Sequence, residues 1–332
     1  MTPLHFTTFF PQYAPTFHKF TAGPCRPQLT AYLNPSAPTT CDYVGCLSGR
    51  VVHCLLANAT ESTKANMAAA AVLLGLLPTT LSLVGSNTVE TGVLALRRPG
   101  LAALLAAGTP AVAPMRLFDY ADAGGLLGRR GPTVGGAGGG GDVEYLAAAA
   151  AVANVAHLSY LIGVQAVCSF SSETVYHPPL WAALAVVLHA WGAWTVRMRN
   201  FVGLAAREFR TCYCGSVEGK LKLAVKDRTA WFIFCTWITS IGTVAHIIYG
   251  TLIFSSILFV STSDAVKIVA RFVASTVVCR VILVFEITGM QQRVEPVTGH
   301  PGVYLGSGSG TGPKELGVFE AAEVDNVQTH RP

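Results

Sequence analysis

Long apolar stretches recur along the chain, and polar segments separate them. An α-helix needs about 20 mostly apolar residues to cross the hydrocarbon layer of a bilayer, where every backbone polar group must be paired. The pattern therefore predicts an all-α fold, a polytopic bundle of about five transmembrane helices with disordered tails. The predicted spans are 67–84, 146–168, 180–196, 232–259 and 265–290.

The last predicted span is less regular than the others because charged side chains interrupt it. These are Lys267, Arg271, Arg280 and Glu286. The stretch 265–290 either crosses the membrane or lies as an amphipathic helix in the interface. If it crosses, Arg280 needs a protein partner, water or a reach toward the nearer interface.

A shorter apolar stretch, 101–114, has arginines on both sides. It is too short to cross the bilayer comfortably, and basic residues at both ends favour a segment that enters and leaves one side. We therefore expect 101–114 to be re-entrant or interfacial. The glycine-rich stretch 131–141 that follows predicts a flexible linker.

Composition supports a membrane protein over a water-soluble enzyme. Hydrophobic residues make up 51% of the chain and charged residues only 12%, whereas soluble domains carry about 25% charged residues. The net charge of +5 is concentrated mainly in one loop between apolar stretches. A nucleic-acid partner would need a basic stripe on a folded face, so none is expected.

That loop, 197–228, carries eight basic and three acidic residues and fixes the predicted orientation. The positive-inside rule places it in the cytoplasm. Alternation then makes 1–64 a non-cytoplasmic N-terminal tail and 291–332 a disordered cytoplasmic tail. Which cellular membrane holds the protein is left open.

The same loop predicts contact with membrane lipids. Its basic side chains attract anionic headgroups by about 1 kcal/mol each near the surface. The residues concerned are Arg197, Arg199, Arg207, Arg210, Lys220 and Lys222. Cys212 and Cys214 lie beside this segment and are candidates for palmitoylation, with plain reduced thiols as the alternative.

The N-terminal tail holds four cysteines, Cys25, Cys41, Cys46 and Cys54. In an oxidising compartment they could form two disulfides by any of three pairings, and in a reducing one they would stay thiols. Asn58 opens an Asn-Ala-Thr sequence and is a candidate for glycosylation. Both modifications require the tail to lie outside the cytoplasm.

Three histidines, His157, His189 and His246, fall near the middle of three neighbouring predicted spans. Neutral imidazoles at a similar depth could converge on a metal ion, or two of them could hold a haem. The alternative is that each forms hydrogen bonds across helices or lines a small wet cavity. No nucleophile motif or phosphate-binding glycine motif is found, so catalytic residues are not assigned.

The stretch 56–99, LANATESTKANMAAAAVLLGLLPTTLSLVGSNTVETGVLALRRP, together with VILVFEITGM at 281–290, resembles uncharacterised multi-span integral membrane proteins of filamentous fungi. The group has no assigned activity, so the resemblance implies a membrane location and no site residues.

These observations favour a non-enzymatic membrane component that acts through contacts with lipids and with unknown membrane protein partners, without a cofactor. A transporter or channel is the second hypothesis, for which paired intramembrane charges and an internal repeat are expected. A metal- or haem-dependent membrane oxidoreductase that uses the three histidines is the third.

Overall fold

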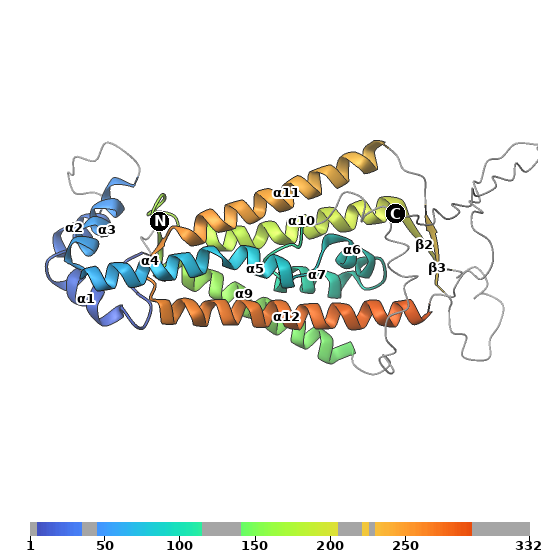
Figure 1. Cartoon of the computed structure of the whole chain (residues 1–332), viewed down its shortest axis with the longest axis horizontal. Coiled ribbons are helices and arrows are strands. Elements are labelled where there is room, and N and C mark those ends of the chain that lie inside the picture. Colours follow the sequence, from blue (N-terminus) through green and yellow to red (C-terminus); the bar gives the residue numbers. More distant parts are fainter. Residues whose placement is uncertain (1–4, 35–44, 115–140, 205–220, 226–229, 294–332) are drawn as a thin grey trace, which may run out of the picture. The chain divides into compact units, whose positions relative to one another are not determined.

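The computed structural model describes residues 5–34, 45–114, 141–204, 221–225 and 230–293 (Figure 1). The predicted all-α bundle is confirmed. Among the described residues, five helical segments are long and apolar enough to cross a membrane: Glu61–Val84, Asp142–Gln165, His177–Met198, Ala230–Ser255 and Thr262–Met290.

The first of these spans is made of two helices, α4 (Glu61–Gly75) and α5 (Leu77–Val84). Thr60 caps α4 by accepting a hydrogen bond from the backbone of Thr63, while Pro78 lies in the first turn of α5. Because proline cannot donate a backbone hydrogen bond, it suits a helix start and explains the interruption.

The remaining spans form two pairs with the same order of elements. α9 (Gly141–Gln165), strand β1 (Val167–Cys168) and α10 (His177–Arg199) make the first pair. α11 (Ala230–Ser255), strand β4 (Ile257–Leu258) and α12 (Thr262–Arg293) make the second. β1 and β4 pair antiparallel and join the two turns. The predicted spans 146–168 and 232–259 therefore end sooner, as helices, than expected.

The uncertain fifth stretch is the longest helix, with 32 residues in α12. The predicted C-terminal tail begins slightly later than expected, because α12 continues to Arg293. Residues 294–332 and the linker 131–141, except for Gly141 at the start of α9, lie outside the described residues.

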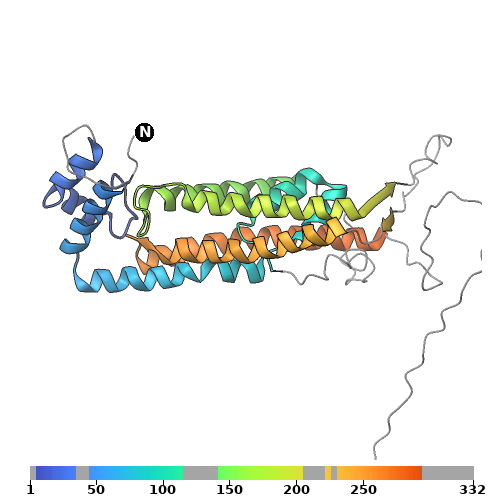
Figure 2. The same cartoon turned by 90° about the horizontal axis from the view of Figure 1, so that it is seen from above.

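The basic loop is partly described and begins with a two-stranded sheet. β2 (Asn200–Leu204) pairs antiparallel with β3 (Leu221–Val225). Figure 2 shows this sheet at one end of the long helices and the N-terminal helices at the opposite end. This separation agrees with the predicted placement of the two segments on opposite sides of a membrane, which stays a prediction.

The segment 1–64, expected only as a tail, contains helices α1 (Ala14–Ala22), α2 (Arg26–Leu33) and α3 (Cys46–Asn58). Phe9 and Phe17 pack edge-on or tilted around Phe259, which follows β4. Aromatic pairs of this kind stabilise by about 0.5–1.5 kcal/mol beyond their buried area. We call the described residues 5–34 and 45–58, which include α1–α3, the N-terminal cap.

Candidate functional site

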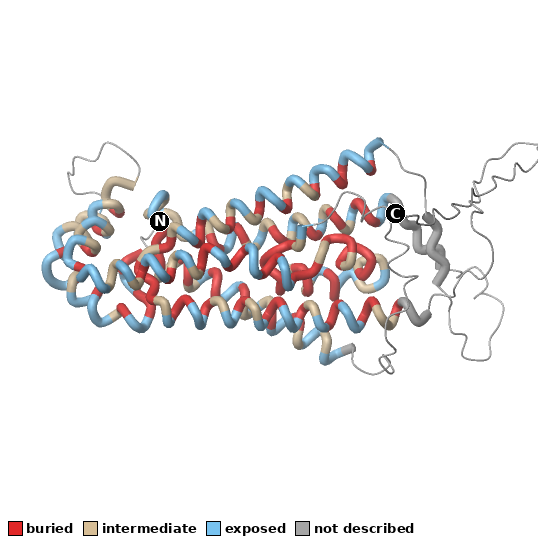
Figure 3. The backbone as a smooth tube through the Cα atoms, in the orientation of Figure 1, coloured by how far each residue is buried: buried red, intermediate tan, exposed pale blue. Residues whose placement is uncertain are grey.

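A buried helical hairpin lies inside the bundle and positions the candidate site. It consists of α6 (Thr88–Arg97) and α7 (Pro99–Gly108), which pack against each other and against α9, α10 and α12. Figure 3 shows this region mostly in the colour of buried residues. The predicted re-entrant or interfacial stretch 101–114 thus begins within α7, against other helices of the bundle.

Local sequence explains why the hairpin forms. Asn87 and Glu90 make a capping box, in which each side chain binds the other residue's backbone N–H. Pro99 starts α7, as expected for a first-turn proline. The backbone N–H of Ala113 donates to the carbonyl of Ser86 at 3.2 Å, so both open ends of the hairpin lie together.

Two glycines allow the hairpin to approach its neighbours closely. A methyl group added at Gly92 would lie 2.8 Å from a side-chain carbon of Val196 in α10. One added at Gly108 would lie 2.6 Å from the sulfur of Cys279 in α12. Larger residues at either position would push the hairpin away from the helices that bury it.

The first charge pair joins the hairpin to α12. The guanidinium of Arg280 binds both carboxylate oxygens of Glu90, with Nη2 3.0 Å from Oε1. The Glu90 side chain is 13% exposed and that of Arg280 is 33% exposed. Glu90 therefore caps α6 and is also the protein partner that the sequence analysis expected for Arg280.

The second charge cluster lies at the turn of the hairpin. Nη1 of Arg98 is 2.7 Å from Oε2 of Glu144 in α9 and 2.5 Å from Oε1 of Glu286 in α12. The guanidinium also lies 5.3 Å from the ring centre of Tyr145. One arginine thus connects three helical segments, and the side chain of Glu286 is only 8% exposed.

Some buried polar groups in α10, in α12 and just before α6 have no partner among the described residues. The hydroxyls of Ser86 and Thr276 form no hydrogen bond within the described part of the chain, nor does Nε2 of His189. Nδ1 of His189 lies 2.9 Å from the hydroxyl of Thr91 in α6. A buried polar group without a partner costs free energy, so such groups mark sites that water or a solute can satisfy.

The structure does not bring the three predicted metal-binding histidines together. His157 is exposed on α9 with Nδ1 3.3 Å from Arg271, whereas His189 faces α6. His246 stacks on the ring of Trp181, and its Nε2 lies 2.9 Å from the Trp181 carbonyl oxygen. No group of three metal-binding side chains occurs among the described residues. Equal depth along a helix does not fix the face, and here His157 lies on the outer surface while His189 and His246 are buried.

The arginine near His157 belongs to a separate polar seam between α9 and α12. Nε and Nη2 of Arg271 donate to the side-chain oxygen of Asn154 at 2.9 and 2.6 Å. Asn154 in turn donates to the Arg271 carbonyl and to Ser275. Arg271 is exposed, and its hydrogen-bond partners in the described part of the chain include no carboxylate.

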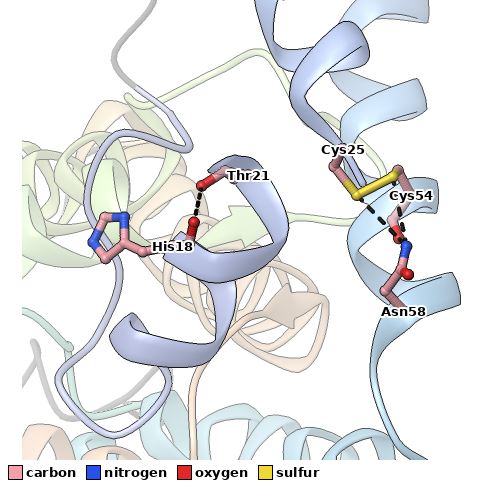
Figure 4. Close-up of a disulfide and its surroundings, with 5 residues drawn as sticks. All are labelled: His18, Thr21, Cys25, Cys54 and Asn58. Atoms are coloured by element: carbon pink, nitrogen blue, oxygen red, sulfur yellow. Dashed lines mark hydrogen bonds between the residues drawn. A yellow bond between two sulfur atoms is a disulfide. The ribbon is translucent and has the colours of Figure 1, made fainter. Parts of the chain in front are cut away.

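The cysteines of the segment 1–64 are placed as follows. Cys25 and Cys54 form a disulfide with Cα atoms 5.8 Å apart, and it joins the start of α2 to α3 (Figure 4). Cys46 is also disulfide-bonded, while Cys41 lies outside the described residues. Asn58, the glycosylation candidate, is exposed and donates to the Cys54 carbonyl at 2.9 Å. Its glycosylation stays a prediction.

The predicted lipid-binding residues are only partly described. Arg197 is exposed near the end of α10, and the backbones of Arg199 and Lys222 lie in α10 and β3. The other predicted lipid-binding residues, Arg207, Arg210 and Lys220, lie outside the described residues. The palmitoylation candidates Cys212 and Cys214 lie outside them as well. Lipid contact and palmitoylation stay predictions.

Sequence reasoning missed Glu90, Arg98 and Glu144 as parts of a charge site. Asn87 and Glu90 have the spacing of a capping box, which marks a helix start after the first span. That signal, with charged residues flanking 101–114, predicts a helical hairpin between two charged ends. The pairing itself depends on helix packing, which the sequence does not display.

Compared with protein-family models, with curated proteins and with solved structures, the chain gives no match. The resemblance to fungal membrane proteins therefore stays a prediction, and the functional argument depends on the site itself.

Proposed function

We propose that this chain is a multi-pass membrane protein of the transporter or channel class, and that the α6–α7 hairpin contacts the ion or small polar solute that it moves. The observation that carries this proposal is the pair of charge clusters, Glu90–Arg280 and Arg98–Glu144–Glu286, between the hairpin and the long helices.

Charge pairs inside a membrane bundle are expensive to maintain. Replacing a buried pair by apolar residues of similar volume is often neutral or stabilising, so such a pair is weak evidence for a purely structural role. Ionisable residues within membrane bundles generally mark pathways for ions or substrates. With a rise of 1.5 Å per residue, Arg280 is about 27 Å from the start of α12 at Thr262, so the pairs lie toward one end of the bundle. The pairs at the hairpin therefore favour a transport role over a structural one.

The interrupted backbone beside the pairs supports the same role. α5 ends at Val84, and α6 begins at Thr88 with its capped N-terminus in the bundle interior. Transporters typically build solute sites from broken helices and unwound segments that line a cavity. The unpaired hydroxyls of Ser86 and Thr276 would offer hydrogen bonds to such a solute.

The repeated order of helix, two-residue strand and helix also favours this class. α9–β1–α10 and α11–β4–α12 share this order, and β1 pairs with β4. Many transporter folds contain two structural repeats with the binding site between them. The sequence shows no repeat, so this signal appears only in the fold.

The sequence favoured a non-enzymatic membrane component that contacts lipids and partners. The charged hairpin favours transport over that hypothesis. The basic loop and its expected lipid contacts are compatible with both hypotheses. Among the described residues His157 lies apart from His189 and His246, so the three do not converge on one ion, and the oxidoreductase hypothesis stays a prediction.

Flux into proteoliposomes tests the proposal. Purified protein is reconstituted, a membrane potential is imposed, and entry of H⁺, K⁺ and Cl⁻ is followed with ion-sensitive dyes. We expect flux of at least one of these ions, and a change of about tenfold in the double variant Glu90→Gln/Arg280→Gln, which removes one interior pair. Glutamine keeps the capping box at this position.

The matched control is Glu61→Gln/Lys64→Gln, because this pair lies exposed at the start of α4. Its flux should equal that of the unaltered protein. An equal response of the two double variants would contradict the proposal and favour the non-enzymatic component.

A further inference from the structure

The face formed by α9 and α12 around Arg271 carries polar side chains that the outer face of α11 lacks between Ile233 and Leu252. On α11 the exposed side chains are large and apolar, which suits lipid tails. They include Ile233, Phe234, Trp237, Ile241, Val244, Ile248 and Leu252. Around Arg271 the exposed side chains on α9 and α12 include two small ones, Ala153 and Ala274, beside the polar His157 and Lys267. Larger apolar side chains, Tyr160 and Val266, are exposed farther along the same helices.

Arg271 lies deep between the ends of the helices. It is nine residues from the start of α12 at Thr262, and Asn154 is eleven residues from the end of α9 at Gln165. With a rise of 1.5 Å per residue these positions are about 14 and 16 Å from the helix ends, near the middle of a bilayer of about 30 Å. The guanidinium binds Asn154 and also lies 3.3 Å from Nδ1 of His157, which is about 12 Å from the end of α9, so it stays between the helix ends.

An exposed guanidinium at this depth is stabilised most strongly by a negative partner. Asn154 and His157 supply hydrogen-bond acceptors and no carboxylate. A second copy of the chain meeting this face symmetrically would bring two arginines together, because α9 has no Asp or Glu after Glu144 and α12 has none between Asp264 and Glu286. Charge complementarity therefore favours a different chain.

We propose that the face around Arg271 binds a transmembrane helix of a partner protein, and that this helix carries an Asp or Glu near the middle of its span. Ala153 and Ala274 let the backbone of that helix approach closely, as small residues do at helix contacts in membranes. Arg271 provides the charge that the carboxylate binds, and Asn154 holds the guanidinium in place. This inference rests on the membrane setting and is independent of transport through the hairpin.

Energy transfer between labelled chains tests this proposal. The full chain, labelled at its C-terminus, is reconstituted in phosphatidylcholine vesicles with a labelled synthetic Leu–Ala helix that has one central Asp. We expect apparent binding about tenfold tighter than for the same helix with a central Leu. Arg271→Leu should abolish this difference, and Arg271→Lys should retain part of it.

Lys267→Gln is the matched control, because Lys267 is an exposed cation one turn nearer the start of α12 and is paired with Asp264. It should leave the preference for the Asp helix unchanged. Equal binding of the two helices, or a preference that survives in Arg271→Leu, would overturn the proposal.

Two further outcomes would assign the face to another occupant and also overturn the proposal. One is energy transfer between two labelled copies of the chain that is lost in Arg271→Leu. The other is Arg271-dependent contact with spin-labelled phosphatidylserine without a preference for the Asp helix. Retained helix content and a single elution peak for each variant show that the chain has folded.

Discussion

Two arginines of α12, nine residues apart, have opposite surroundings. Arg280 points at the hairpin and binds both oxygens of the Glu90 carboxylate. Arg271 lies on the outer surface and binds Asn154 and His157, which are not carboxylates. The same charged group is neutralised within the chain at one position and held by hydrogen bonds at the other.

This difference shows that the two halves of α12 have different roles. The C-terminal half carries Arg280 and Glu286, which contact α6 and the turn at Arg98. The N-terminal half carries Arg271 and contacts the N-terminal cap through Asp264, which accepts a hydrogen bond from the backbone of Gln12. Changes in the two halves should therefore have different effects on stability.

The largest expected effect is at the interior pair. Glu90→Gln keeps the helix cap but leaves Arg280 without its carboxylate, and removing one partner of a buried pair costs about 3–5 kcal/mol. Glu90→Gln/Arg280→Met removes both charges and should recover most of this loss. Thermal unfolding of the detergent-solubilised variants measures it, and a loss below about 1 kcal/mol in Glu90→Gln would remove the contrast with Arg271.

The sequence alone predicted much of α12 and little of its pairing. The length and hydropathy of 265–290 indicated a span, and Arg280 was expected to need a partner. Glu90 was not found because it lies 190 residues earlier in the chain, in a helix that the sequence did not predict. Depth along a helix can be counted from the sequence, whereas the face and the neighbour depend on packing.

The N-terminal cap shows the same limit. Four cysteines indicated disulfides, but three pairings fitted equally well, and only the fold brings Cys25 to Cys54. The aromatic contacts to Phe259 join segments more than two hundred residues apart. No local pattern in the segment 1–64 indicates that its helices pack on a turn between the last two spans.

The disulfide of the cap should give the second largest effect. Cys25→Ser/Cys54→Ser is expected to destabilise the cap by about 2–4 kcal/mol, because the unfolded segment regains conformational freedom. Hydrogen exchange should increase in α1–α3 and at the N-terminal end of α12, while residues around Arg280 stay protected. Increased exchange throughout α12 would show that its halves are not independent.

A smaller effect is expected at the seam between α9 and α12. Asn154→Ala removes the acceptor of two hydrogen bonds from Arg271 and should cost about 1.5–3 kcal/mol, the range for bonds to charged groups. Ser275→Ala is the control, since it removes a neutral partner of Asn154 and should cost about 1 kcal/mol. Equal losses in thermal unfolding would mean that Asn154 does not hold the guanidinium.

The smallest effect concerns pH and the N-terminal cap. Burial lowers the pKa of His5 below its ordinary value of 6.5, and the backbone of Thr174 and Val164 offsets this only in part. Since the unfolded chain then binds the proton more readily, the cap should be fully stable above about pH 6.5 and lose stability as the pH falls below it. The loss of stability can reach about 1.4 kcal/mol per pH unit.

Hydrogen exchange of α1–α3 at pH 7.5 and 5.5 measures this loss. His5→Gln should reduce the difference in exchange between the two pH values, whereas a substitution at the exposed His53 should not. An equal change in hydrogen exchange around Arg280 would show that the N-terminal and C-terminal halves of α12 respond to pH together. That result would contradict the contrast between its two arginines.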